Sequence, residues 1–228
     1  MLRWKRILRD ILIWALLCFV MGIIAAFYEI EASTVQFFIV VCCVIYLLVT
    51  SLYYIVFMQP YRKRVMQQNA DMEAGKSQTA LEDIKAMQEE PLVRRSRYLT
   101  QCCQINLSAA YCRLEQYDRA LEVLNAMPEK KLKERVRLVH HLNTCICLFY
   151  NGTEQEALEY YRTHEKLFHA YRNDRQYRGN LVMLKCWALS AQGKLEEAHE
   201  ILSQAKELCN TPSLMTAYEK LEQRLTNI

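Results

Sequence analysis

The residues of this 228-residue chain that could do chemistry are its five histidines and ten cysteines. His141 and Cys145 stand four positions apart, so on a helix they share a face and could hold a metal ion. Both also fit the packing face of that helix, and we interpret them as core residues. His164 and His169 are five positions apart and do not share the face that a zinc-binding helix needs. We therefore expect no metal site and no cofactor.

Other chemical patterns are incomplete. Residues 75–77 (Gly-Lys-Ser) look like the end of a phosphate-binding loop, but Ala70 stands where the loop needs its first glycine. The cysteine pairs 42–43 and 102–103 are adjacent, so their side chains diverge on a helix and do not form a CxxC motif. No catalytic Ser-His-Asp or Cys-His arrangement can be assigned. The chain is therefore predicted not to be an enzyme and to have no small-molecule substrate.

Composition narrows the class of protein further. The sequence is 52% hydrophobic and has only 5 glycines and 4 prolines, which excludes collagen-like, low-complexity and wholly disordered chains. Its 29 basic and 25 acidic residues give a net charge of +4 without a concentrated basic stripe. A nucleic-acid binder would show such a stripe, so we expect no nucleic-acid partner.

Two long stretches near the start carry no charge. They are residues 11–28 and 32–61, and only a short acidic segment at residues 29–31 separates them. About 20 apolar residues in a helix span a bilayer. The sequence therefore predicts a transmembrane hairpin over residues 1–61, with spans at about 11–28 and 35–58.

Basic residues flank the hairpin, while its turn has none. Because Lys and Arg favour the cytoplasmic side, this distribution predicts a multi-pass membrane protein with its N-terminus and its C-terminal domain in the cytoplasm. The basic residues expected to face the membrane are Arg3, Lys5, Arg6, Arg62, Lys63 and Arg64. An alternative reads residues 1–26 as a cleaved signal peptide, which leaves the second span and the cytoplasmic tail unchanged. In a reducing cytosol the cysteines would serve as small packing residues.

The remainder of the sequence contains an internal repeat. Similar Ala-containing segments begin at Ala80, Ala120, Ala157 and Ala198, roughly every 40 residues. A glycine precedes three of these alanines by five residues, and prolines follow three of the segments. This pattern is typical of a helix, a short turn, a second helix and a break.

Packing residues also recur at matching places. They are Leu107, Ser108, Tyr111, Leu114, Tyr117, Leu121 and Leu124, then Cys145, Leu148, Leu158 and Tyr161, then Cys186, Leu189, Leu195, Leu202 and Ala205. These residues resemble the tetratricopeptide repeat (TPR) family, most closely at residues 193–198. Two departures are a period longer than the family's and Glu115 in a position where glycine is expected.

The resemblance implies an all-α fold in which helix pairs stack into a right-handed superhelix. We expect the hairpin at 1–61 to be followed by a cytosolic helical-repeat domain at 62–228. Its units are predicted at about 62–90, 91–128, 129–174 and 175–211, with a C-terminal cap helix at 212–228.

In such a superhelix the first helix of each pair lines a concave groove. The predicted partner-binding residues are Ile105, Ala109, Cys112, Leu142, Ile146, Phe149, Met183 and Trp187. This apolar surface could receive an amphipathic segment of a partner protein. It could equally be filled by the cap helix or a second copy, or belong to the core. TPR domains that bind acidic C-termini carry Lys and Asn where this chain has Ile105 and Ala109, so no carboxylate clamp is expected.

These observations predict a membrane-anchored TPR-like scaffold or adaptor. It would bind an unidentified protein partner at the cytoplasmic face of the lipid bilayer. The alternative is a subunit or assembly factor of a larger membrane protein complex, in which the transmembrane hairpin is the binding element.

Overall fold

A computed structural model describes residues 20, 22–23, 31–151, 153–208 and 212–226. Over these ranges the chain consists of helices joined by turns and contains no strand, which confirms an all-α fold. The chain divides into two compact units, Met1–Arg62 and Lys63–Ile228. We describe each unit by itself.

From residue 32 on, the first unit is one apolar helix. It comprises α2 (Ala32–Tyr53), a π-helical turn (Tyr54–Met58) and the start of α3 (Gln59–Glu73). Pro60 has no N–H to offer the carbonyl of Val56, and the wide turn lies at this point.

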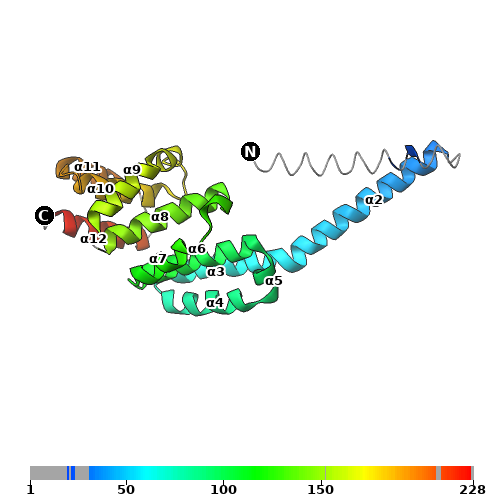
Figure 1. The fold of residues 1–228 in the computed structure, drawn as a ribbon, viewed down its shortest axis with the longest axis horizontal. Helices are drawn as coiled ribbons and strands as arrows, with labels where there is room; N and C mark the ends of the chain where they lie inside the picture. The colour runs from blue at the N-terminus through cyan, green and yellow to red at the C-terminus, as the bar shows by residue number, and fades with distance from the viewer. Residues whose placement is uncertain (1–19, 21, 24–30, 152, 209–211, 227–228) are drawn as a thin grey trace. The chain divides into compact units, whose positions relative to one another are not determined.

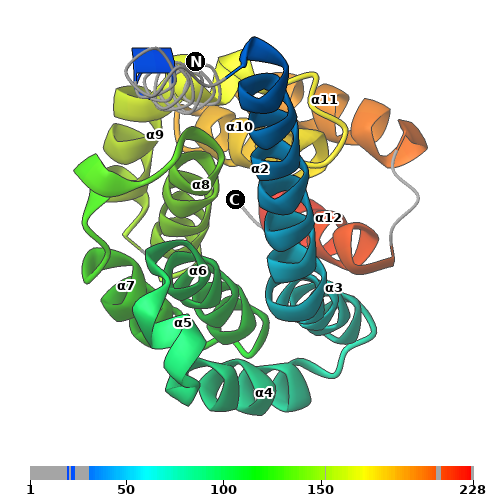
Figure 2. The same cartoon turned by 90° about the vertical axis from the view of Figure 1, so that its right-hand side faces the viewer.

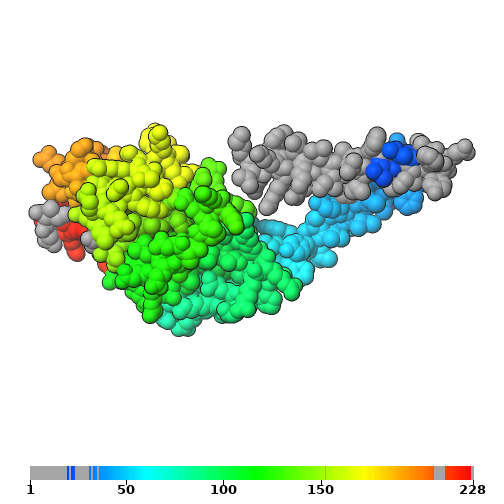
Figure 3. Space-filling model, viewed as in Figure 1, coloured from blue at the N-terminus to red at the C-terminus, as the bar shows by residue number. Residues whose placement is uncertain are grey.

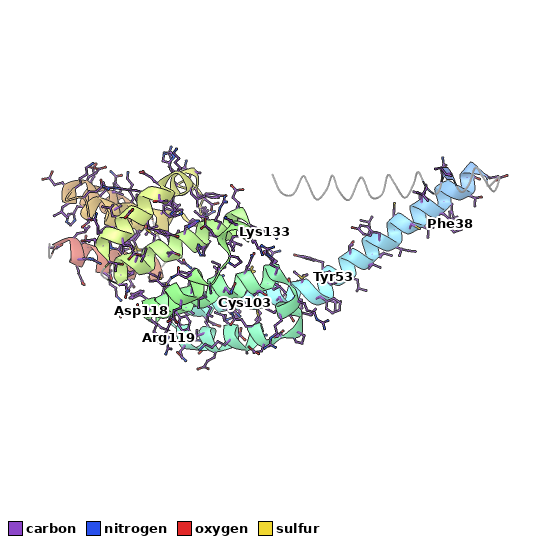
Figure 4. The ribbon with its side chains drawn as sticks, in the orientation of Figure 1. Phe38, Tyr53, Cys103, Asp118, Arg119 and Lys133 are labelled. Atoms are coloured by element: carbon purple, nitrogen blue, oxygen red, sulfur yellow. The ribbon has the colours of Figure 1, made fainter. Side chains whose placement is uncertain are left out.

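The helical run Gln36–Glu73 is long and apolar enough to cross a membrane, and none of its most apolar window is buried. Its apolar side chains, such as Phe37 at 66% exposure, contact little protein. Figure 4 shows Phe38 and Tyr53 on this helix. The predicted first span at 11–28 lies almost wholly outside the described residues, as do Arg3, Lys5 and Arg6.

The second unit is a series of packed helices that begins in α3. After α3 come α4 (Ser77–Glu89), α5 (Pro91–Arg95), α6 (Arg97–Arg113), α7 (Tyr117–Asn125), a 3-10 turn η2 (Glu129–Lys131), α8 (Glu134–Tyr150), α9 (Glu154–Ala170), α10 (Arg178–Ser190), α11 (Leu195–Leu208) and α12 (Pro212–Thr226) (Figure 1). Helix α6 packs on α7, α8 on α9 and α10 on α11. Successive pairs meet through α6 with α8 and α8 with α10. The helix pairs of this unit follow a curve. Figure 2 shows α7, α9 and α11 on its outside and α6, α8, α10 and α12 on its inside.

The core lies between the two layers of helices. Phe149, Leu184 and Tyr218 are at most 1% exposed, and the repeated alanines Ala120 and Ala198 are fully buried. A small residue lets two helix backbones approach closely, which explains alanine at these places. Figure 3 shows the helices of this unit in contact along its surface.

Arg64, one of the basic residues predicted to face the membrane, makes side-chain contacts within the second unit. Its Nε donates to Asp83 Oδ1 at 2.8 Å, and its guanidinium also pairs with Glu90. Buried Gln68 donates to Asp83 at 2.7 Å and accepts from Asn106 at 3.2 Å. The Arg64 guanidinium, which hydrogen-bonds the Asp83 carboxyl, lowers the pKa of that carboxyl. Polar contacts thus join α3 to α4 and α6.

Three turns between paired helices have the same backbone geometry. The second or third residue after the first helix has a positive φ, at Gly75 (78°), Glu115 (59°) and Gly193 (75°). In each turn the next N–H bonds the carbonyl five residues back, at 2.8 Å for Lys76, 2.9 Å for Gln116 and 3.0 Å for Lys194. This is the Schellman arrangement that ends a helix. Glu115 therefore occupies a conformation that favours glycine, as its place in the repeat predicts.

Gly193→Ala is expected to lower the free energy of unfolding by about 1–2 kcal/mol, because an L-residue pays that amount in the left-handed region. No atom lies within 4 Å of a Cβ added at Gly193, so only the backbone conformation opposes the change. Glu115→Gly places a glycine in the same left-handed conformation, so it should not lower the free energy of unfolding to this extent. Urea unfolding of the full chain in detergent, followed by circular dichroism, measures both. A Gly193→Ala protein as stable as the parent would contradict the argument.

Candidate functional site

A cavity of about 610 Å³ opens on the inner layer of the second unit. Five of the predicted groove residues line it, from α6, α8 and α10. They are Ala109, Cys112, Leu142, Ile146 and Met183. The wall also includes the turn after α3 and one side of α12. The structure thus brings together residues from segments far apart in the sequence.

Ile105, Phe149 and Trp187 lie in the core, not in the predicted groove. Their exposed fractions are 9%, 0% and 3%, and the Phe149 and Trp187 rings stack with centroids 5.4 Å apart. An inner helix is contacted by its own partner helix and by both neighbouring pairs. Only a narrow strip of it therefore faces the cavity, and the helical period alone does not locate that strip.

Polar groups surround the apolar wall. Asn143 and Asn180 line the cavity together with Arg113, Glu115 and Lys220. An amide side chain can donate to and accept from a peptide backbone at the same time. The cavity therefore has apolar walls and a few polar groups, a combination that fixes the orientation of a bound segment.

Helix α12 covers part of the inner layer. Lys220 Nζ lies 2.6 Å from Glu115 Oε1, and Arg224 Nη1 donates to the Phe149 carbonyl at 3.0 Å. That carbonyl lies in the last turn of α8, where carbonyls have no partner within the helix. Arg224 also pairs with Glu154 at 3.4 Å. The cap helix is thus fixed to α8 and leaves the cavity beside it.

Several thiols of this unit have raised pKa values. Cys112, at the cavity wall, has its Sγ 3.0 Å from that of Cys147, and this contact together with burial raises the pKa of Cys112. Burial raises the pKa of Cys103, Cys145 and Cys186 to about 12. A protonated thiol is a poor nucleophile, so these cysteines serve as packing groups. Figure 4 shows Cys103 among the helices.

The histidines meet in a way that sequence spacing did not reveal. The Cys145 Sγ contacts the Ala157 carbonyl at 3.8 Å. His141 stacks on His164, with ring centroids 3.9 Å apart, and Glu129 lies beside them. The three residues come from η2, α8 and α9, so no pattern within one helix could have found them.

Of the predicted membrane-facing basic residues, two are exposed in the first turns of α3. Arg62 donates to the Tyr54 hydroxyl at 3.3 Å, and Lys63 is exposed. Both lie just after the apolar stretch, where Lys and Arg meet lipid head groups in membrane proteins.

No family model matches the sequence, and no curated protein and no solved structure matches it. The class of protein is therefore defined by the fold and the site. It is an all-α protein with packed helix pairs, a cavity on the inner layer, and a helix whose length and composition suit a membrane span.

Proposed function

We propose that this protein is a membrane-anchored TPR-like scaffold whose helical domain binds a segment of a partner protein at the cytoplasmic face of a membrane. The observation that carries the proposal is the cavity of about 610 Å³ on the inner layer. Its apolar wall can bury apolar side chains of the partner segment, and its amide side chains can orient that segment. Apolar walls with a few polar groups are typical of a binding site.

The recurrence of one turn geometry supports the repeat interpretation. Gly75, Glu115 and Gly193 each stand five residues before an alanine that is at most 1% exposed. A repeat array places one helix of each unit on a shared inner surface, and that surface is where such proteins bind partners.

The size of the cavity limits its occupant. A helix with side chains is about 10–12 Å wide and rises about 5.4 Å per turn, so this volume holds about one turn of helix or a few extended residues. The occupant is therefore a short apolar segment, whose peptide groups meet Asn143 and Asn180. The cations Arg113 and Lys220 and the carboxylate of Glu115 surround it with charges of both signs.

A membrane anchor would assist the binding of so short a segment. A helix fixed in the bilayer confines the domain to the membrane surface and raises its effective concentration for other membrane components. Arg62 and Lys63 support the cytoplasmic orientation, because basic residues flank the cytoplasmic ends of spans.

The test is a crosslinking capture in native membranes. Ile146→Glu places a charge in the cavity wall at a residue that is only partly buried, so the fold should survive. We expect it to reduce recovery of the partner at least tenfold, because an unpaired charge is costly in an apolar site. Glu156→Lys, on the exposed face of α9, is the matched control and should capture as the parent does. Recovery by folded Ile146→Glu equal to that of the control would contradict the proposal.

A second candidate function rests on the apolar helix. In the described residues its side chains are exposed, and Leu48 and Leu52 are 64% and 62% exposed, so lipid or another membrane protein covers them. The chain would then be a subunit or assembly factor that binds through its membrane segment. Replacing residues 1–58 by an unrelated anchor discriminates the two. Retained capture favours the cavity, and lost capture favours the membrane helix.

A further inference from the structure

Three potential metal ligands meet on the side of the second unit formed by η2, α8 and α9. They are Glu129, His141 and His164, and their ligand atoms all lie within 4.8 Å of one another. None of the three lines the 610 Å³ cavity. The cluster is therefore separate from the site on which the proposed function rests.

The distance between the His141 and Glu129 ligand atoms matches that between two ligands of one ion. His141 Nε2 lies 3.4 Å from Glu129 Oε1, which is longer than an ordinary N–H···O hydrogen bond. Nitrogen and oxygen ligands lie about 2.0–2.2 Å from a tetrahedral zinc ion, which places two of them about 3.3–3.6 Å apart. The observed spacing leaves room for an ion between the two atoms.

One residue orients both imidazole rings. The Tyr160 carbonyl lies 2.9 Å from His164 Nδ1, and the Tyr160 hydroxyl lies 2.7 Å from His141 Nδ1. A carbonyl only accepts, so His164 carries its proton on Nδ1 and presents a lone pair on Nε2. The hydroxyl can accept from His141 Nδ1–H in the same way. Ligand histidines in metal sites are held by such contacts through their other ring nitrogen.

The buried member of the cluster is His141, which is 2% exposed. With its proton on Nδ1, its Nε2 lone pair faces the Glu129 carboxylate, and a cation between these two acceptors turns repulsion into attraction.

We propose that Glu129 Oε1, His141 Nε2 and His164 Nε2 form a binding site for a divalent transition-metal ion of the zinc type. Two imidazoles and one carboxylate are a ligand set that suits zinc. The Glu129 side chain is 57% exposed, so water can reach the remaining coordination position. The ion would join the η2 connection to the α8–α9 pair. Because η2 follows α7, the ion would crosslink one helix pair to the next.

The experiment uses the full chain in detergent, purified with chelator and titrated with Co²⁺ and then with Zn²⁺. We expect one equivalent of Co²⁺ to give visible d–d absorption that Zn²⁺ displaces. His164→Ala and Glu129→Gln change residues that are not fully buried, and each should weaken Zn²⁺ binding at least tenfold. His169→Ala, an exposed histidine on the same helix, is the matched control and should bind as the parent does.

Two further readouts keep the proposal falsifiable. Circular dichroism of each variant must match the parent, which separates lost ligands from a lost fold. Tyr160→Phe retains the carbonyl contact to His164 but removes the hydroxyl contact to His141, and it should weaken binding less than His164→Ala does. A parent protein that takes up no Co²⁺ or Zn²⁺ would overturn the proposal. So would equal weakening by His164→Ala and His169→Ala.

Discussion

Phe149→Ala is expected to lower the free energy of unfolding by about 3–5 kcal/mol, the cost of emptying a buried aromatic site. The Phe149 side chain is fully buried, and its ring stacks on Trp187 in the contact between α8 and α10. Its carbonyl also accepts the hydrogen bond from Arg224 that fixes α12. The substitution keeps this carbonyl, so loss of the ring loosens the contact between α8 and α10. Chemical unfolding of the full chain in detergent, followed by circular dichroism, measures the change.

Ile146→Ala provides the matched comparison. Ile146 lies one turn earlier on the same helix but borders the cavity and is partly exposed. The alanine removes fewer buried contacts there, so it should cost less than half as much as Phe149→Ala. Equal losses would mean that Phe149 is not the core residue the structure describes. The result also bears on the partner site, because a destabilising change at Phe149 cannot report on binding.

The organisation of the second unit could be predicted from local patterns. Helix ends follow from turn geometry, and Gly75 and Gly193 have the positive φ that their positions before Ala80 and Ala198 indicate. The recurring alanines Ala80, Ala120, Ala157 and Ala198 are all buried where helices touch. Such features depend on residues that are close in the sequence, and the repeated pattern therefore indicates them directly.

Contacts between distant segments could not be predicted in this way. Lys220 meets Glu115 across 105 residues of sequence, and this contact joins α12 to the turn after α6 beside the cavity. Arg64 follows an apolar stretch and has the charge pattern of a membrane-facing residue. Its partners Asp83 and Glu90 become neighbours only when α3 and α4 pack. The sequence shows where a charged residue stands, but the fold determines which residues it contacts.

The same reasoning explains why some residues predicted for the groove lie in the core, and why the histidine cluster was not predicted. Phe149 and Trp187 have the helical period of groove residues, yet each faces a neighbouring helix instead of open space. His141 and His164 belong to different helices and share no spacing rule. A period identifies a face of a helix, and only packing determines what covers that face.

Acid is expected to destabilise the metal-free protein through His141. Its pKa is about 3 in the folded protein, because burial and then His164, His140 and Arg137 disfavour the charged ring. In the unfolded chain a histidine has a pKa near 6.5. Between these two values the unfolded chain binds the extra proton. The free energy of unfolding therefore falls as the pH falls, by about 1 kcal/mol per pH unit, and is independent of His141 above pH of about 7.

The window of about pH 6.5 to 5.5 isolates this effect, because Glu115, whose pKa is lowered by its hydrogen bond with Lys220, contributes only at more acidic pH. Asp83 has a lowered pKa, so its contribution is lost only at more acidic pH, near and below the usual carboxyl range of about 3.9. Unfolding curves at several pH values, in chelator, should show a slope that His141→Phe flattens and that His169→Phe leaves unchanged. The slope is the informative quantity, since the His141→Phe protein loses its Tyr160 contact and its stability shifts at every pH. An unchanged slope in His141→Phe would show that this buried ring is not what makes the folded protein sensitive to acid.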